Sequence, residues 1–173
     1  MRFSQTTKYH GLSSIYFNSI IEQIITIGDL NKKNNILDYG CGEKKIQEKL
    51  NKKIYNYDVN PLYSEIEDDN LKNLKIETVI LSHVLMYMTI KEIKKLFNQF
   101  YQLNSNMNFV VALGKQNLLS NILKYLTFNK DAHKGTLTSY DDQVSYIYNE
   151  FNIKKVKNDI FFMTYVISFS FKK

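Results

Sequence analysis

The sequence predicts a three-layer α/β/α sandwich on a mostly parallel β-sheet that ends in an antiparallel strand pair. Short apolar runs typical of buried strands alternate with segments of helical periodicity, which is the pattern of a parallel sheet covered by helices. Two strand-like segments close the chain, 153–161 and 163–171, and so short a connection allows only an antiparallel hairpin or a bent pair. The 173 residues, 44% of them hydrophobic, are expected to form one domain, with 1–30 as an N-terminal cap and helix and 31–173 as the α/β core.

The first third of the chain contains two helices and two strands. Apolar residues after Ser14 fall mainly on one helical face. Ser14 is expected to cap this helix, and Gly28 to end it in the left-handed conformation. The next elements are a strand, a short helix and a second strand, over 35–39, about 43–50, and 54–57.

The connection after the second strand is unusually short. Only 19 residues separate Asp58 from Thr78, too few for a full helix, a further strand and connections of usual length. This connection is therefore expected to contain only a short strand or a turn around 65–69. A helix opening at Thr89 has capping-box spacing to Glu92. The other expected elements are strands over 78–82 and 109–113, helices over 116–126 and 139–150, and a loop over 127–138.

The turn after the first strand carries the main functional signal. An apolar strand ends in Asp38 and is followed by Gly40 and Gly42, in a chain with only 6 glycines. Glycine is needed where backbone turns sharply or approaches a ligand closely, and the start of a helix presents N–H groups to a ligand. Ligands of parallel sheets bind at the carboxyl ends of the strands. The turn is therefore expected to share one crevice with Asp58, Ser82–His83 and Gly114.

Two features of this turn favour an adenosine cofactor with a cationic amino group over a dinucleotide. Asp58 lies 20 residues after Asp38, where an acid can accept hydrogen bonds from ribose hydroxyls in either case. A dinucleotide motif starting at Gly40 would need a third glycine at the position of Lys45. Asp38 is also a poor neighbour for a pyrophosphate and a good one for an ammonium group. S-adenosylmethionine is thus favoured over NAD.

The segment Ile36–Gly42 resembles the first motif of the class I S-adenosylmethionine-dependent methyltransferases, an apolar pair followed by Asp-x-Gly-Cys-Gly. Asp58 matches the ribose-binding acid of that family, and Thr78–Leu85 resembles its fourth-strand segment. The closing strands fit its antiparallel final hairpin. The resemblance implies a Rossmann-like methyltransferase fold, shortened after the second strand.

The resemblance also implies roles for single residues. The backbone of Tyr39, Gly40, Cys41 and Gly42 would cradle the methionine part of S-adenosylmethionine, and Asp38 would orient its amino group. Asp58 would hold the ribose, while Val59 and Asn60 would border the adenine. Ser82 and His83 would lie near the methionine end. The acid that contacts adenine in many relatives is assigned here to Asp69, with Asp68 as the alternative.

Other reactive side chains have simpler interpretations. Cys41 is interpreted as a small residue in a tight space, since no histidine is paired with it in the sequence pattern. His83 and His133 are the candidates for a general base, and each can equally be a pocket wall or a surface residue. The dispersed histidines and single cysteine predict no metal site. Asp58 can also be a simple helix cap.

The resulting hypothesis is a methyltransferase that acts on an O, N or C nucleophile. A small-molecule, lipid or glycan acceptor is favoured because no added RNA-binding module is recognisable. The formal net charge of +6 keeps RNA as an alternative acceptor. A catalytically inactive, cofactor-binding partner subunit is the remaining alternative. The lone cysteine and the lack of a signal-peptide or membrane-spanning pattern predict a cytoplasmic protein.

Overall fold

A computed structural model describes residues 12–115, 135–158 and 163–172. Its six-stranded sheet has the order β2-β1-β3-β4-β6-β5, parallel from β2 to β4 and antiparallel from β4 to β5. The strands are β1 (Ile36–Tyr39), β2 (Tyr55–Tyr57), β3 (Thr78–Ser82), β4 (Asn108–Gly114), β5 (Phe151–Asn158) and β6 (Thr164–Phe171). The helices are α1 (Leu12–Ile27), α2 (Lys45–Leu50), α3 (Ile90–Leu103) and α5 (Tyr140–Glu150). The predicted three-layer fold with a terminal antiparallel pair is confirmed.

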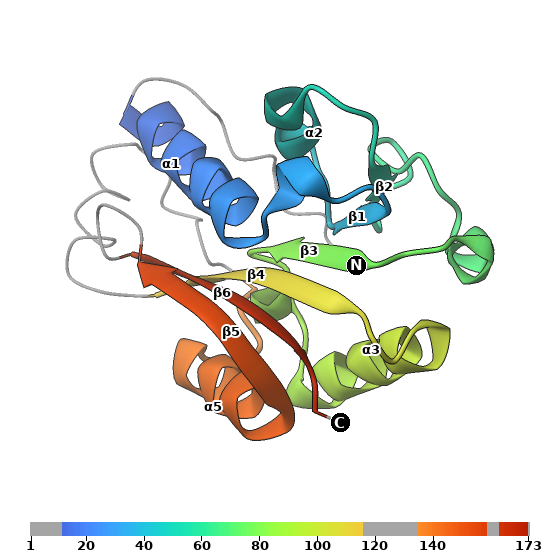
Figure 1. Ribbon diagram of the computed structural model, residues 1–173. Coiled ribbons are helices and arrows are strands. Elements are labelled where there is room, and N and C mark those ends of the chain that lie inside the picture. Colours follow the sequence, from blue (N-terminus) through green and yellow to red (C-terminus); the bar gives the residue numbers. More distant parts are fainter. Residues whose placement is uncertain (1–11, 116–134, 159–162, 173) are drawn as a thin grey trace.

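Helices cover both faces of the sheet, α1 and α2 on one side and α3 and α5 on the other (Figure 1). Each face has its own apolar core. Ile24, Ile36 and Ile80 belong to the core under α1, whereas Leu37, Phe97 and Phe109 belong to the core under α3. The middle strands β3 and β4 are buried on both faces, as their continuous apolar runs predict.

Both ends of α1 differ from the expectation. The helix begins at Leu12, so Ser14 lies inside it, and the left-handed residue after the helix is Asp29 (φ 49°) and not Gly28. A Cβ on Gly28 would lie 2.7 Å from Leu30 Cδ2 and 2.8 Å from Val110 Cγ2. Gly28 therefore lets the end of the helix approach β4, and aspartate tolerates the left-handed position that follows.

The capping box expected at the start of α3 is confirmed, and α5 also begins with a side-chain cap. Thr89 and Glu92 form a reciprocal capping box at the start of α3, and the Ser139 side chain accepts from the Asp142 N–H at the start of α5. Of the predicted loop over 127–138, only 135–138 belong to the described residues, and the predicted helix over 116–126 lies outside them.

The connection from β2 to β3 is shortened, as predicted. Residues 58–77, whose backbone is described throughout, contain the 3₁₀ helix η2 (Asp68–Asn73) and no strand. β2 is therefore the edge of the sheet. The Glu65 N–H donates to the Asn56 carbonyl oxygen at 2.9 Å, so a loop covers part of this edge where another strand would otherwise pair.

Candidate cofactor site

The chain reverses direction between β1 and α2 through a turn with several left-handed residues. Gly40 (φ 83°), Gly42 (φ 46°) and Lys44 (φ 59°) all have positive φ values. A Cβ on Gly40 would lie 2.4 Å from Val84 Cγ2, so this glycine is required by packing. A Cβ on Gly42 would meet nothing within 4 Å. Gly42 therefore faces open space, as a residue beside a ligand should.

The amide groups of this turn bond to β2 and the residue after it. The N–H groups of Gly40 and Cys41 donate to the Tyr57 carbonyl oxygen at 2.7 and 3.1 Å, and the Gly42 N–H donates to Asp58 Oδ2 at 3.0 Å. The expectation of a turn with unpaired N–H groups is therefore wrong for these three amides. They continue the hydrogen bonding between β1 and β2, which fixes the shape of the turn.

Asp38 is the most unusual polar residue of the site. Its side chain is 1% exposed, and its Oδ1 atom has no hydrogen-bond partner among the described residues. Burial, with a smaller contribution from the negative charge of Asp58, raises the pKa of Asp38 to about 7. A buried carboxyl oxygen without a partner is costly. At the carboxyl end of β1, a cationic or hydrogen-bond-donating group beside Asp38 would offset that cost.

Asp58 follows β2 and joins the turn to the next loop. Its Oδ1 atom accepts from the Asn60 N–H at 2.8 Å, while Oδ2 bonds Gly42. Asn60 in turn accepts from the Leu62 N–H at 3.1 Å, and Val59 is 56% exposed. Each Asp58 oxygen keeps a further acceptor position. The predicted ribose and adenine residues thus form one hydrogen-bonded loop beside Gly42.

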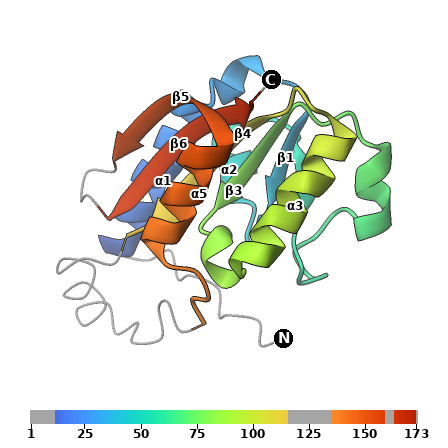
Figure 2. The ribbon, with the colours of Figure 1, turned by 90° about the horizontal axis from the view of Figure 1, so that it is seen from below.

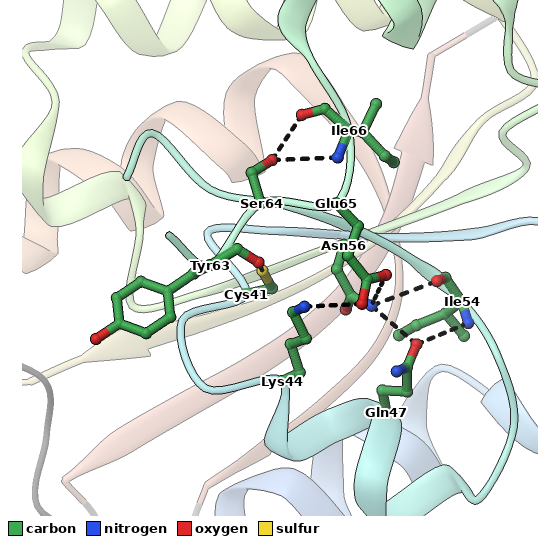
Figure 3. A network of polar contacts seen from close by, with 9 residues as sticks. All are labelled: Cys41, Lys44, Gln47, Ile54, Asn56, Tyr63, Ser64, Glu65 and Ile66. Atoms are coloured by element: carbon green, nitrogen blue, oxygen red, sulfur yellow. Dashed lines mark hydrogen bonds and ion pairs between the residues drawn. The ribbon is translucent and has the colours of Figure 1, made fainter. Parts of the chain in front are cut away.

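A polar network holds this loop against α2 (Figure 3). The Asn56 amide nitrogen donates to Gln47 Oε1 at 2.8 Å and to Glu65 Oε2 at 2.9 Å, and Lys44 forms an ion pair with Glu65 at 2.7 Å. The Asn56 hydrogen bond, then Lys44, lowers the pKa of Glu65. The network therefore positions the loop after β2 without help from a neighbouring strand.

The Cys41 side chain packs in a tight, buried space, which agrees with its interpretation from the sequence. Its thiol is buried and donates to the Tyr63 carbonyl oxygen at 3.6 Å. Burial, followed by the charges of Asp38 and Asp58, raises the pKa of the thiol to about 12. The thiolate needed for nucleophilic attack is therefore disfavoured at neutral pH.

Ser82 and His83 end β3 on the other side of β1. His83 has a left-handed backbone (φ 58°), which is uncommon for a residue with a side chain. Its Nδ1 atom lies 3.4 Å from Ser82 Oγ, and its Nε2 atom lies 3.2 Å from Thr164 Oγ1. Thr164 Oγ1 also lies 2.5 Å from the Tyr16 hydroxyl oxygen. Side chains from α1, β3 and β6 thus form one polar chain.

Thr164 is the site residue that sequence reasoning missed. No local pattern marks it, because its position depends on the pairing of β6 with β4, which sets Thr164 opposite Gly114.

Two predicted site residues cannot be placed. The side chain of Asp69 lies outside the described part of the structure, although its backbone belongs to η2, and His133 lies outside it altogether. Among the described residues, no group of His, Cys, Asp or Glu is arranged to hold a metal ion, and no helix is long and apolar enough to cross a membrane.

Two grooves elsewhere contain none of the predicted cofactor residues. One of about 490 Å³ lies between α3 and α5, and includes Ile90, Leu137 and Tyr146. The other, of about 890 Å³, lies at the β2 edge beside Ile54 and Glu65. The carboxyl ends of β1, β2 and β3 remain the place where the unusual backbone and the buried acid meet.

No protein family profile matches the sequence, and no curated protein matches it significantly. Solved structures do match. A magnesium protoporphyrin IX methyltransferase from Synechocystis PCC 6803, with bound SAH, has a TM-score of 0.61 at 12% identity, over 97% of this chain and 90% of that one. The N-methyltransferase NodS from Bradyrhizobium japonicum WM9, in complex with S-adenosyl-L-homocysteine, has a TM-score of 0.63 at 12% identity, over 91% and 88%.

An RNA enzyme has the same fold. The small RNA methyltransferase HEN1 has a TM-score of 0.68 at 10% identity, over 99% of this chain and 27% of that one. Together with the strand order and the turn after β1, these similarities identify the architecture. The chain has the fold of the class I S-adenosylmethionine-dependent methyltransferases.

Proposed function

We propose that this protein is an S-adenosylmethionine-dependent methyltransferase. The observation that carries the proposal is the buried, unpartnered Oδ1 atom of Asp38 at the carboxyl end of β1, close in sequence to a Gly42 that faces open space. A carboxylate in this position is stabilised by a cationic amino group. The methionine part of S-adenosylmethionine carries such a group, so the residues present fit the cofactor.

The proposed roles divide the site into three parts. Asp38 and the backbone of 39–42 hold the methionine part, with Ser82 and His83 beside it. Asp58 holds the ribose through acceptor positions that its bonds to Gly42 and Asn60 leave open. Val59 and Asn60 border the adenine, and Asp69 is the proposed acid at the adenine.

Methyl transfer requires little of the protein beyond positioning the two reactants. S-adenosylmethionine supplies a methyl group that is already activated as a sulfonium. The protein must align the acceptor with that group and exclude competing water. His83 is the proposed base for an acceptor that must lose a proton, because its ring is held by Thr164 and Ser82 at this edge. His133 is the second candidate.

A small-molecule, lipid or glycan acceptor remains the proposal, with RNA as the alternative. The fold serves both kinds of acceptor, since the neighbours include enzymes named for a porphyrin and for small RNA. We also propose that the protein acts in the cytoplasm, as its single cysteine suggests.

Isothermal titration of S-adenosylmethionine and its product S-adenosylhomocysteine tests the cofactor proposal. Wild type is expected to bind both. Asp58→Ala should weaken binding by about tenfold to a hundredfold, because hydrogen bonds to a charged group contribute about 1.5–3 kcal/mol. Asp142→Ala is the matched control, since Asp142 is an exposed acid of α5. A folded wild type that binds neither ligand would overturn the proposal.

Turnover separates an enzyme from an inactive binding subunit. S-adenosylhomocysteine formation is measured with phenols, amines, lipids, glycans and RNA as acceptors. Product formed with one class, and lost in His83→Asn, supports the proposed base. Asparagine suits this test because it tolerates the left-handed backbone of position 83. Cofactor binding without product in any class would favour the partner-subunit alternative.

A further inference from the structure

Five lysines gather at the amino ends of the strands, opposite the proposed cofactor site. Lys32 and Lys33 belong to or follow the 3₁₀ helix η1 (Leu30–Lys32), Lys52 precedes β2, and Lys154 and Lys155 lie in β5. Figure 2 shows that η1 and the C-terminal end of β6 lie at the same end of the sheet. We call these five residues the lysine cluster.

Contacts between these elements show that the lysines of the cluster, which come from three separate segments of the chain, lie near one another in space. The Lys52 ammonium group donates to the carbonyl oxygens of Leu30 and Lys33, both at 2.5 Å. Lys155 forms an ion pair with Asp29 at 2.7 Å, and the positive charges of Lys32 and Lys33 also stabilise the Asp29 carboxylate. The pKa of Asp29 is lowered, first by Lys155.

The positive charges of the lysine cluster are only partly balanced. Burial, and then the charge of Lys33, lowers the pKa of Lys154, so these two ammonium groups are close enough to repel. Within the described ranges, the acids that make contacts at this end of the sheet are Asp29, which pairs with Lys155, and Glu77, which accepts from the Asn35 side chain at 3.2 Å. Two acids against five lysines leave a net positive surface that an anion would stabilise.

Part of the lysine cluster is already ordered for binding. Lys52 is held by two carbonyl groups, Lys154 by Asn108 and Lys155 by Asp29. An ammonium group has three donors, so each of these retains at least one. The ammonium groups of Lys32 and Lys33 make no hydrogen bond or ion pair with the described part of the chain. Cations that are held in place lose little side-chain entropy on binding.

We propose that the lysine cluster binds the phosphate backbone of RNA. Its charges come from three separate segments, which suits successive phosphates of a polymer better than a single small anion. A membrane surface is less suited, because interfacial binding also uses apolar side chains that insert. Among the exposed large apolar residues of the described ranges, only Val156 adjoins a lysine of the cluster in sequence.

This surface is separate from the proposed methyl-transfer site. The lysine cluster lies at the amino ends of the strands, whereas Asp38, Asp58 and Ser82 lie at the carboxyl ends. It therefore anchors RNA without touching the reacting atoms. Since it uses no cofactor residue, its test does not depend on the proposed activity.

Fluorescence anisotropy with a labelled oligouridylate of about 20 nucleotides tests the proposal, without S-adenosylmethionine. Wild type is expected to bind, and more weakly as salt rises between about 50 and 200 mM. Lys32→Gln/Lys33→Gln should raise Kd about tenfold at constant salt. The slope of log K against log salt should fall by about 1.4, since each contact with a single strand contributes about 0.7.

Lys91→Gln/Lys95→Gln is the matched control. Both lysines are exposed on α3, on the other face of the sheet, and the two double variants remove equal charge from a chain of formal net charge +6. The control is expected to change Kd by less than about twofold, because distant charges are screened. Three outcomes would overturn the proposal: no RNA binding by wild type, equal loss in both variants, or tighter binding to phosphatidylserine vesicles than to RNA.

Discussion

At each end of the sheet, two groups of like charge lie close enough for one to shift the pKa of the other, but their surroundings differ. At the carboxyl end, Asp38 is 1% exposed and the nearby charge of Asp58 adds to the rise of its pKa. At the amino end, partial burial and then the charge of Lys33 lower the pKa of Lys154, on a surface that is largely exposed. The same type of repulsion therefore acts in a buried crevice and on a solvated face.

This difference determines what each end contributes. Charge effects are large where water is excluded and small where water and salt screen them. The carboxyl end is expected to control folding stability and cofactor affinity together. The amino end is expected to control only the attraction of an anionic partner. Substitutions at the two ends should therefore differ strongly in their effect on stability.

The largest effect is expected for Gly40→Ala. The added Cβ would lie 2.4 Å from Val84 Cγ2, at a φ of 83°. Backbone strain and overpacking together should lower the free energy of unfolding by about 3–5 kcal/mol. Thermal and urea denaturation measure this. Gly42→Ala is the control, since it also has a positive φ (46°) but its Cβ would meet nothing within 4 Å, so it adds backbone strain without overpacking. Equal destabilisation by both substitutions would contradict the distinction between a packing glycine and a ligand-facing one.

Asp38→Asn should have the next largest effect, and the effect should depend on pH. The folded protein holds a proton on Asp38 up to about pH 7, whereas the unfolded chain loses it near 3.8. The stabilisation that comes from holding this proton in the folded state is complete below the unfolded pKa of 3.8, and it disappears as pH rises towards the folded pKa of about 7. Wild type should therefore lose about 2–4 kcal/mol relative to the variant between pH 4 and pH 8. Urea denaturation across this range measures the difference, and parallel curves would contradict it.

Asn56→Ala should destabilise the loop after β2 by about 1–3 kcal/mol, since it removes the hydrogen bonds from the Asn56 amide to Gln47 and Glu65 and leaves Glu65 only its ion pair with Lys44. Limited proteolysis within 58–77 and the melting temperature measure this change. Asn70→Ala is the control, because Asn70 is exposed in the same connection. Unchanged proteolysis in Asn56→Ala would show that the network does not hold the loop.

The smallest effect is expected for Lys155→Gln at the amino end. The substitution removes the exposed ion pair with Asp29, and such pairs add little to stability because water and salt screen them. The melting temperature should stay nearly constant, while RNA affinity should fall. A large loss of stability would contradict the comparison between the two ends.

Most of the sheet could be predicted from local sequence. The bounds of β3 agree with its β-branched apolar run, and the capping box of α3 agrees with Thr89 and Glu92. The shortened connection followed from the 19 residues between Asp58 and Thr78, compared with the pattern of the family that the sequence resembles. These features depend on periodicity and spacing, which a single sequence contains.

The parts that could not be predicted depend on contacts between distant segments. Gly28 looked like a helix-ending glycine, but its contact with Val110 of β4 explains it, and Asp29 reverses the chain. The bonds from Gly40 and Cys41 to Tyr57 follow from the pairing of β1 with β2. Thr164 reaches His83 only because β6 pairs with β4 in a particular register.

The most direct test of the proposed site is proton release when S-adenosylhomocysteine binds. Titration calorimetry at pH 7 in two buffers with different ionisation enthalpies measures it. Because the amino group of the ligand favours the ionised form of Asp38, whose pKa is about 7, wild type should release about half a proton. Asp38→Asn should release none and bind more weakly. Tight binding to wild type without proton release, or equal release by the variant, would contradict the pairing of Asp38 with the cofactor.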